Sequence, residues 1–328
     1  MRTMAIERFG GAEVLHPAEL PTPVPGPGEV LIKVAYAGVN PADWKCREGW
    51  LARYFQYRFP FVLGFDAAGV VVQLGEGASG CVPGDRVVAY SRQGMGEWGS
   101  YAEYVVAAAD GVALLPAAVP LAEAAALPTA GITAFEGLFE SGRLGRGQRV
   151  LVHGGAGGVG SYAIQLARHA GAAVAATCSP RNQDYVRSLG AELAIDYRAG
   201  RIADQIPAWA PTGLDLVLDA VGRNSLPQAV ELVRPGGVIA PIATLIADEV
   251  PHDAGRARQR GVRIMPTISS YQRSGAQLRR LAALCGEGVL RAPALAVLPL
   301  EQAAEAHRLV QAGHVRGKLV LEVAGESV

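Results

Sequence analysis

The sequence predicts an α/β protein made of a β-rich part and a six-stranded, doubly wound parallel sheet. Three observations lead to this prediction. Short β-prone runs, separated by clusters of proline and glycine, fill about the first 110 residues. From residue 148 onward, apolar strands alternate with helical segments, which is typical of a parallel sheet covered by helices on both faces. A glycine-rich loop, residues 154–160, joins the first strand and the first helix of this alternating region.

The N-terminal part contains several β-prone runs before a long helical segment. The runs are residues 29–35, 69–73, 85–90 and 100–106. Their short length and their proline- and glycine-rich spacers predict a small antiparallel barrel or sandwich. A helical segment follows at residues 120–140, where apolar side chains recur on common faces.

The alternating region is expected to contain six strands, the number found in a complete dinucleotide-binding sheet. The strands are expected at residues 149–153, 172–177, 193–196, 215–220, 237–243 and 262–267, with helices at 158–169, 182–189 and 226–232. A helix at 274–285 then leads to a strand at 296–299, a helix at 301–312 and a last strand at 318–322.

Composition limits the class of protein. The 328 residues are half hydrophobic and 18% charged with no net charge, so we expect two domains with large cores and no nucleic-acid partner. The four cysteines lie far apart and predict neither a disulfide nor a CxxC metal site, which fits a cytoplasmic location. The N-terminus has no apolar signal stretch. Charges and prolines interrupt the most apolar region, residues 105–132, so no membrane span is expected.

The loop Gly155-Ala156-Gly157-Gly158-Val159-Gly160 has the pattern GxGxxG between a predicted strand and a predicted helix. In dinucleotide-binding proteins one glycine allows the tight turn, one lets the pyrophosphate approach the backbone, and the last lets the helix pack on the strand. The helix N-terminus offers N–H groups and positive potential to the phosphates. We therefore predict that these six residues bind a dinucleotide; a tight turn without a ligand is the alternative.

The end of the second strand of this sheet indicates which dinucleotide binds. An NAD site has Asp or Glu there, about 20 residues after the glycine loop, to hold the ribose 2′-hydroxyl. This chain instead has Ser179 and Arg181, and it contains no carboxylate there before Asp184. A hydroxyl and a guanidinium suit a 2′-phosphate, which a carboxylate would repel. The sequence therefore predicts NADPH, although Ser179 is also suited to cap a helix beside a solvated Arg181.

Several further motifs occur in order along the chain: VNPADW, FPFVLGFDAAGVV, GDRVVAY, GSYAEYVV, LPTAGITAFEGL and RGKLVLE. Together with the glycine loop, they resemble the medium-chain dehydrogenase/reductase superfamily over essentially the whole chain. The most similar branch is that of the zinc-free (zeta-crystallin-like) quinone oxidoreductases, with the alkenal reductases beside them. The resemblance implies a GroES-like β-barrel catalytic domain of residues 1–120 and 266–328. A Rossmann NADP(H)-binding domain, residues 121–265, is then inserted between the two segments.

The resemblance also implies that the chain has no catalytic metal. Zinc alcohol dehydrogenases of this superfamily have a Cys where this chain has Asn40, and a His where it has Phe65. An amide and a phenyl ring cannot replace thiolate and imidazole as ligands of Zn²⁺. We therefore predict no metal site and interpret Cys46 as a buried or incidental thiol.

Without a metal, hydride transfer to the activated double bond of a quinone or an α,β-unsaturated carbonyl needs hydrogen-bond donors and a proton source. Asn40 is the first catalytic candidate, because its NH₂ group can donate to a substrate oxygen or a cofactor hydroxyl; turning the chain before Pro41 is its alternative role. Tyr54 and Tyr57 are candidate proton donors, with water as an equal alternative. Packing in the core is the other interpretation of their aromatic segment.

Further cofactor contacts follow from the resemblance. The residues expected near the nicotinamide are Thr129, Val221, Gly222, Ala243, Thr244 and Leu245, most of them just beyond the carboxyl ends of predicted strands. Tyr197 is expected along the adenosine 2′-phosphate. Lys318, which matches the terminal lysine of the family, is expected to help bind cofactor or substrate; a strand-edge lysine is the alternative.

These observations predict an NADPH-dependent, zinc-independent reductase of quinones or α,β-unsaturated carbonyls. One alternative is an enoyl-thioester (enoyl-CoA) reductase, for which the Arg-rich segment 255–263 would supply a basic entrance. Another is an NADPH-binding sensor or structural protein with little turnover. A homodimer is expected through the sixth strand, residues 262–268, although Pro266 removes one hydrogen-bond donor there.

Overall fold

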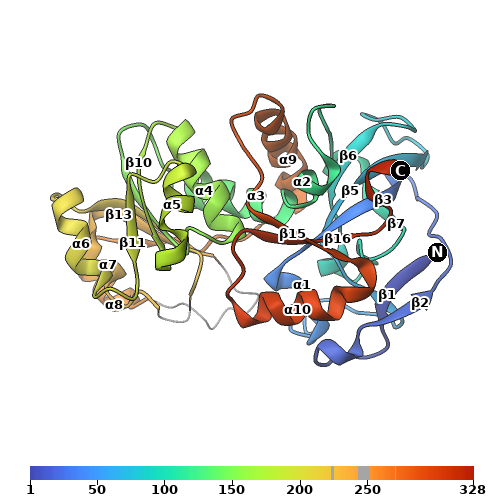
Figure 1. Ribbon diagram of the computed structural model, residues 1–328, viewed down its shortest axis with the longest axis horizontal. Helices are drawn as coiled ribbons and strands as arrows, with labels where there is room; N and C mark the ends of the chain where they lie inside the picture. The colour runs from blue at the N-terminus through green and yellow to red at the C-terminus, as the bar shows by residue number, and fades with distance from the viewer. Residues whose placement is uncertain (223–224, 243–251, 270) are drawn as a thin grey trace. The chain divides into compact units, whose positions relative to one another are not determined.

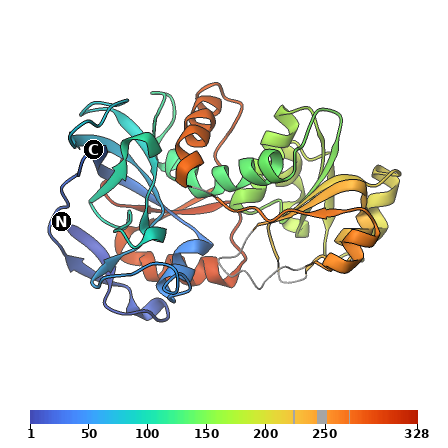
Figure 2. The same cartoon turned by 180° about the vertical axis from the view of Figure 1, so that it is seen from behind.

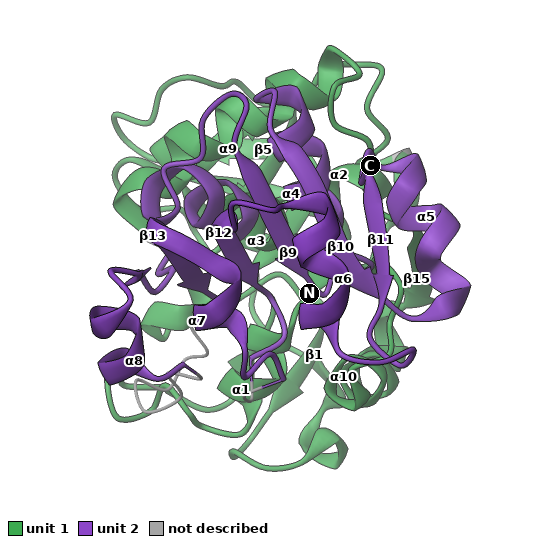
Figure 3. Cartoon of the chain, turned by 90° about the vertical axis from the view of Figure 1, so that its left-hand side faces the viewer, with its two compact units in different colours: residues 1–132, 270–328 green, residues 133–269 purple. Residues whose placement is uncertain are grey.

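The computed structural model divides into two compact units, which Figure 3 shows in different colours. It describes residues 1–222, 225–242, 252–269 and 271–328. Unit 1 comprises residues 1–132 and 270–328, and unit 2 comprises residues 133–269. The sequence places the boundaries at 120/121 and 265/266. In the structure, residues 121–132 group with unit 1 because helix α2 (Leu121–Ala125) packs on strands β3 (Glu29–Val39) and β5 (Asp66–Leu74).

Unit 1 is built on two β-sheets. The larger has the strand order β15-β16-β3-β5-β6-β8, with β7 also paired to β3, and the smaller has the order β2-β1-β4. Pairing is antiparallel, as the short runs predict, except between β15 and β16. The other strands are β1 (Arg2–Ile6), β2 (His16–Glu19), β4 (Phe61–Val62), β6 (Arg86–Tyr90), β7 (Tyr104–Ala108), β8 (Val112–Leu114), β15 (Leu295–Pro299) and β16 (Lys318–Glu322).

Three neighbouring strands of the larger sheet bring together residues that are far apart in the sequence. β16 pairs with the end of β3 and places Lys318 beside Asn40, and β5 pairs with β3 so that Gly38 lies opposite Asp66. Gly38 permits this close approach. A Cβ there would lie 2.3 Å from the Ala125 carbonyl oxygen and 2.9 Å from the Asp66 side chain.

Helices α1 (Pro41–Arg47), α9 (Tyr271–Gly286) and α10 (Ala303–Ala312) complete unit 1 (Figure 1). A buried contact joins α1 to α10: Arg47 Nη1 lies 3.1 Å from His307 Nδ1, and His307 Nε2 lies 3.1 Å from the Tyr101 hydroxyl. Because a guanidinium can only donate, Nδ1 accepts and Nε2 carries the proton. Burial, reinforced by the charge of Arg47, lowers the pKa of His307 to about 3 and keeps the ring neutral.

Unit 2 contains the predicted six-stranded parallel sheet. Its strand order is β11-β10-β9-β12-β13-β14, which in order of appearance is 3-2-1-4-5-6, the order of a doubly wound dinucleotide-binding fold. Figures 1 and 2 show these strands from opposite sides, coloured from green to orange. The strands are β9 (Arg149–His153), β10 (Ala173–Cys178), β11 (Leu193–Asp196), β12 (Leu214–Asp219), β13 (Val233–Pro241) and β14 (Arg263–Ile264).

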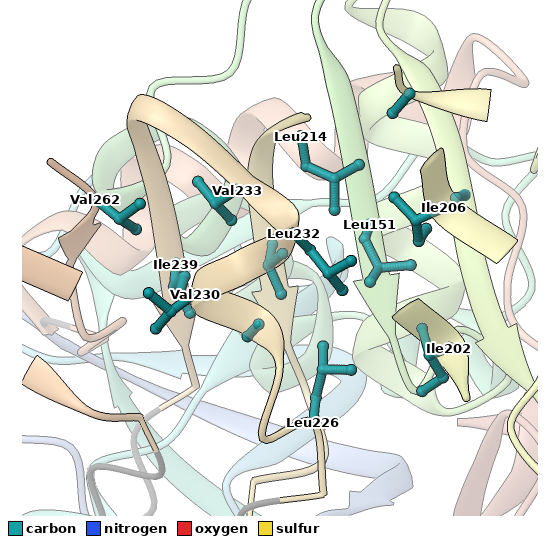
Figure 4. Close-up of a cluster of buried hydrophobic side chains, with 14 of the residues drawn as sticks. Leu151, Ile202, Ile206, Leu214, Leu226, Val230, Leu232, Val233, Ile239 and Val262 are labelled. Carbon is teal, nitrogen blue, oxygen red and sulfur yellow. The ribbon is translucent and has the colours of Figure 1, made fainter. Parts of the chain in front are cut away.

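Helices on this sheet bury the apolar strand residues that the sequence predicts. In one cluster, Leu151 of β9 and Ile239 of β13 pack with Ile206 of α6 and Val230 of α7 (Figure 4). The helices of unit 2 are the end of α3 (Pro128–Phe135), α4 (Gly158–His169), α5 (Gln183–Ser188), α6 (Ile202–Trp209), α7 (Ala229–Leu232) and α8 (Ala254–Gln259). Within the described ranges, no helix combines the length and the apolar character that crossing a bilayer requires.

The sixth strand is shorter than the sequence predicts. β14 covers only Arg263 and Ile264. The missing N–H of Pro266 is not the cause, because alternate residues donate to β13 and position 266 faces away from that strand. On either side of Pro266, Met265 donates to the Ile239 carbonyl at 2.8 Å and Thr267 donates to the Pro241 carbonyl at 2.8 Å. Hydrogen bonding to β13 therefore extends beyond β14 as far as Thr267, although these residues do not form a regular strand.

Candidate functional site

The glycine loop of unit 2 has the geometry that its pattern predicts, with one shift. The left-handed residue is Gly154 (φ +84°), directly before the motif. A Cβ on Gly155 would lie 2.7 Å from Ala176 Cβ, and a Cβ on Gly160 would lie 2.3 Å from the Gly154 carbonyl oxygen, so both glycines permit close packing. A Cβ on Gly157 would meet only one atom, at 3.6 Å. That space and the N–H groups at the start of α4 suit a pyrophosphate.

The residues predicted at the 2′-phosphate gather at one edge of the sheet of unit 2. β10 and β11 are neighbours, with Cys178 paired to Asp196, so Ser179 and Arg181 after β10 lie at the same edge as Tyr197 after β11. Tyr197 is exposed, and the guanidinium of Arg198 lies 5.6 Å from its ring centroid. Sequence reasoning missed Arg198, although it directly follows Tyr197 in the IDYR motif.

A buried amide at this edge lacks a hydrogen-bond partner. Asn182 Nδ2 donates to Ser179 Oγ at 3.2 Å, while Asn182 Oδ1 is buried without a partner in the described part of the chain. Turning the amide by half a turn would let Oδ1 accept from the Ser179 hydroxyl and would place the NH₂ group at the buried position that Oδ1 now occupies. In either orientation the amide bonds to Ser179 and helps to hold the turn after β10.

The loop after β12, predicted to line the nicotinamide, is held by Asp219. Its Oδ1 accepts the N–H groups of Val221 at 3.0 Å and Gly222 at 2.9 Å, and its Oδ2 lies 3.1 Å from His252 Nε2. Burial opposes ionisation of Asp219, but the bond from His252 and the nearby His153 hold the pKa of this carboxyl below its ordinary value. The charged carboxylate fixes the loop. The predicted residues Ala243, Thr244 and Leu245 lie outside the described residues.

His153 ends β9, immediately before the glycine loop. Its Nδ1 lies 2.8 Å from Thr177 Oγ1, and its Nε2 lies 2.9 Å from Ser225 Oγ. Thr177 Oγ1 also accepts the N–H of Gly154 at 2.9 Å. Burial lowers the pKa of His153, so the ring is neutral and links β9, β10 and the loop after β12. This agrees with a structural role for the residue.

In unit 1, three residues predicted on separate grounds meet at one carboxylate, Asp66. Asn40 Nδ2 donates to Asp66 Oδ2 at 2.8 Å, and both the N–H and the hydroxyl of Thr129 donate to Asp66 Oδ1. Lys318 Nζ donates to Asn40 Oδ1 at 2.5 Å and to the Val39 carbonyl at 3.0 Å, and it lies 3.5 Å from Asp66 Oδ2. Lys318 is therefore a buried cation and not a lysine on an exposed strand edge.

A second carboxylate supports the same group. Asp43 accepts the Asn40 N–H at 2.7 Å, the Phe65 N–H at 3.1 Å and Gln93 Nε2 at 2.8 Å. Burial, followed by repulsion from Asp66, raises the pKa of Asp43 to about 7. We call Asn40, Asp43, Asp66, Gln93, Thr129 and Lys318 the Asp66 cluster. The sequence analysis missed its central residue, Asp66, since only strand pairing reveals the shared contacts.

The two candidate proton donors occupy different environments. Tyr54 is 54% exposed and contacts the guanidinium of Arg53, 4.8 Å from its ring centroid. Tyr57 packs edge-on against Phe9 and Phe61, and its hydroxyl is buried without a hydrogen-bond partner in the described ranges. Burial, together with the adjacent Cys46, raises the pKa of Tyr57. The structure thus does not bring Tyr54 together with Tyr57.

Comparison with known proteins adds to this geometry. An alcohol dehydrogenase GroES-like domain model matches residues 26–117, and a zinc-binding dehydrogenase model matches residues 189–321. The chain is 34% identical to a chloroplastic quinone oxidoreductase of Triphysaria versicolor, over 98% of each chain. It is also 34% identical to a chloroplastic NADPH-dependent alkenal/one oxidoreductase of Arabidopsis thaliana, over 98% of this chain and 79% of that one. A solved structure of an NAD-dependent alcohol dehydrogenase is 31% identical, with a TM-score of 0.88 over 98% of this chain and all of that chain.

Proposed function

Because the chain belongs to the medium-chain dehydrogenase/reductase superfamily, in its branch of quinone and alkenal oxidoreductases, we propose that it is an NADPH-dependent, zinc-independent reductase of quinones or α,β-unsaturated carbonyls. The relatives make it an oxidoreductase that uses a nicotinamide cofactor. The observation that carries the finer proposal is the Asp66 cluster, where a buried ammonium and an oriented amide are held ready for a substrate oxygen.

The preference for NADPH rests on the residues at the ends of β10 and β11. The names of the relatives include both dinucleotides, so the chain's own side chains must decide. β10 is followed by Ser179 and Arg181, without a carboxylate to hold a ribose 2′-hydroxyl. Arg198, next to Tyr197, adds a second guanidinium. This set of donors fits a 2′-phosphate.

Zinc independence rests on the donors present in unit 1. Among the residues matched to the metal corner of the zinc enzymes, Asn40 and Phe65 offer neither thiolate nor imidazole. Lys318 places an ammonium group within hydrogen-bond distance of Asn40 and 3.5 Å from Asp66. A second cation at this position would be repelled by that ammonium. These residues therefore do not fit Zn²⁺, whatever the matched family description suggests.

The mechanism follows from these contacts. Bound NADPH supplies the hydride. The glycine loop and the start of α4 hold the pyrophosphate. Lys318 donates to Asn40 Oδ1, and Asn40 donates one of its two amide N–H groups to Asp66. The second N–H of that amide can then donate to the oxygen of the acceptor. The Lys318 ammonium stabilises negative charge that develops on that oxygen, and the proton then comes from Tyr57 or from water.

The test is a panel of acceptors assayed with each dinucleotide. We expect consumption of NADPH with a p-quinone and with a 2-alkenal, and much slower consumption of NADH. Binding of NADPH by the wild type without any acceptor-dependent oxidation would favour the alternative of a sensor. Turnover confined to enoyl-CoA would favour the enoyl-thioester reductase. One arginine of the Arg-rich segment, Arg256, already pairs with Glu231 at 3.2 Å.

The proposal includes a cytoplasmic homodimer. β14 is the last strand in the sheet of unit 2, and Met265 and Ile268 beside it are 41% and 68% exposed. An exposed sheet edge with apolar side chains suits pairing with a second copy across a two-fold axis. Light scattering that gives the mass of one chain would contradict the dimer, and cell fractionation tests the location.

A further inference from the structure

Three aromatic rings of unit 1 form a stack next to the Asp66 cluster. Phe65 and Tyr90 stack with ring centroids 5.5 Å apart and an interplanar angle of 17°, and Tyr90 and Tyr271 stack at 5.1 Å and 25°. Phe65 precedes Asp66, and Tyr90 is the strand partner of Asp66. The stack therefore begins next to Asp66, at Phe65, and ends on Tyr271, the first residue of α9.

The outer ring of this stack has features that a purely structural residue rarely combines. Tyr271 is only half-buried, and in the described part of the chain the ring has no aromatic neighbour besides Tyr90. Its hydroxyl, in contrast, is buried and makes no hydrogen bond of regular geometry among the described residues, although the Gly94 backbone and the Tyr90 hydroxyl lie near enough to oppose the rise in its pKa that burial causes. A buried hydroxyl without a well-formed hydrogen bond is unfavourable, so a ligand that accepts from it would gain binding free energy.

A glycine provides the space for this hydroxyl. A Cβ on Gly94 would lie 2.7 Å from Tyr271 Oη and 3.0 Å from Phe65 Cε1. Gly94 has no positive φ, so backbone conformation does not require glycine there. Glycine is thus required here because a side chain at position 94 would collide with the Tyr271 hydroxyl and the edge of the Phe65 ring.

A second half-buried tyrosine, Tyr57, lies near Cys46, as Tyr271 does. The Tyr57 hydroxyl also lacks a partner in the described ranges. Burial raises the pKa of both tyrosines, and the Cys46 thiol raises the pKa of each further, so all three groups are neutral around one thiol. The sequence predicts Tyr57 as a candidate proton donor, whereas no sequence motif indicates a role for Tyr271.

We infer that Tyr271 is a substrate-binding, specificity-determining residue of this enzyme: its ring extends the Phe65–Tyr90 stack to receive a planar conjugated acceptor, and its hydroxyl donates to an oxygen of that acceptor. The inference rests on the proposed function, because it assigns a binding role toward the same conjugated acceptor. It adds a preference between classes of acceptor. Acceptors with a ring should be bound both by stacking on the Tyr271 ring and by the hydrogen bond from its hydroxyl. Short open-chain acceptors should be bound by the hydrogen bond alone.

Two substitutions separate the ring from the hydroxyl. Tyr271→Phe keeps the ring, so kcat/KM should fall about 3- to 10-fold for a p-quinone and for a short 2-alkenal alike. Tyr271→Leu also removes the ring, so kcat/KM should fall a further 3- to 10-fold, roughly, for the quinone but not for the alkenal. The KM for NADPH should stay unchanged in both. Tyr104→Phe, on β7, is the matched control and should retain wild-type kinetics for both acceptors.

Gly94→Ala tests the geometry independently of activity. The added methyl would clash with Tyr271 Oη, so Gly94→Ala should lower Tm in the wild type and lower it less in the Tyr271→Phe background. Gly111→Ala is the control, since its Cβ would have no neighbour closer than 4.0 Å. An equal drop in Tm for Gly94→Ala in both backgrounds would contradict the placement of Tyr271.

The outcomes distinguish this inference from the proposed function. Turnover of both acceptors that is unaffected by Tyr271→Phe and Tyr271→Leu overturns the inference and leaves the proposed function intact. If the wild type turns over neither acceptor, titration with a p-hydroquinone decides: weaker binding to Tyr271→Leu by about 3-fold or more supports the ring site without the reductase activity. Equal binding to both proteins, or none, overturns the ring site as well.

Discussion

Replacing Lys318 by Met removes the cation of the Asp66 cluster and keeps most of the apolar stem. Three contacts disappear: to the Val39 carbonyl at 3.0 Å, to Asn40 Oδ1 at 2.5 Å, and to Asp66 Oδ2 at 3.5 Å. The lysine side chain is 5% exposed and that of Asp66 is fully buried, so water cannot take over these contacts. Breaking one partner of a buried pair costs about 3–5 kcal/mol. We expect the free energy of unfolding to fall by that amount.

Urea denaturation followed by tryptophan fluorescence measures this loss, since Trp44, Trp50 and Trp98 all lie in unit 1. Lys33→Met, a substitution of the same chemistry on β3, should change stability by less than about 0.5 kcal/mol. The double variant Lys318→Met/Asp66→Asn should regain much of the loss, because the remaining buried group is neutral. A cost below about 1 kcal/mol for Lys318→Met would refute the assignment of Lys318 as the counter-ion of Asp66.

Other predictions concern the cofactor site and pH. Arg181→Ala and Arg198→Ala should each lower kcat/KM for NADPH by about 10-fold or more and leave NADH unchanged; equal losses for the two cofactors would contradict a 2′-phosphate site. Gly157→Val should preserve Tm, because the side chain meets little protein, but it should abolish NADPH binding. Gly160→Ala should lower both Tm and NADPH affinity, because its Cβ collides with the Gly154 carbonyl. Thermal melting measures Tm, and fluorescence titration measures the binding. The pKa of His307 is about 3 in the folded protein, against an ordinary value of 6.5 in the unfolded chain. The free energy of unfolding should therefore decrease as pH falls from about 6.5 to 3, by up to about 5 kcal/mol. His307→Gln should show a shallower loss of stability over that range; an unchanged slope would mean that His307 is not held neutral.

Most of the fold of unit 2 could be predicted because its signals are local. Apolar runs and glycines alone located β9 at 149–153 and α4 at 158–169, and the six-strand count was confirmed. The sixth strand was predicted too long, because an apolar run does not show how many of its residues pair regularly with the neighbouring strand β13. Arg198 was within reach of the motif reasoning, since it follows Tyr197 directly.

The arrangement of unit 1 was less accessible from the sequence. Asn40, Thr129 and Lys318 were each named, but Asp66, which joins them, was not. Their contact depends on the register of β16 and β5 against β3, and side-chain periodicity does not specify which strands pair. The same holds for Tyr271, which meets Tyr90 only after α9 packs on β6.

The central claim is hydride transfer from NADPH to a polarised double bond without a bound metal. The most direct measurement is the rate of quinone-dependent NADPH oxidation by enzyme dialysed exhaustively against a strong chelator, with metal content determined on the same sample. We predict an undiminished rate at a negligible zinc content. A rate that disappears on chelation and returns on addition of Zn²⁺ would contradict the account.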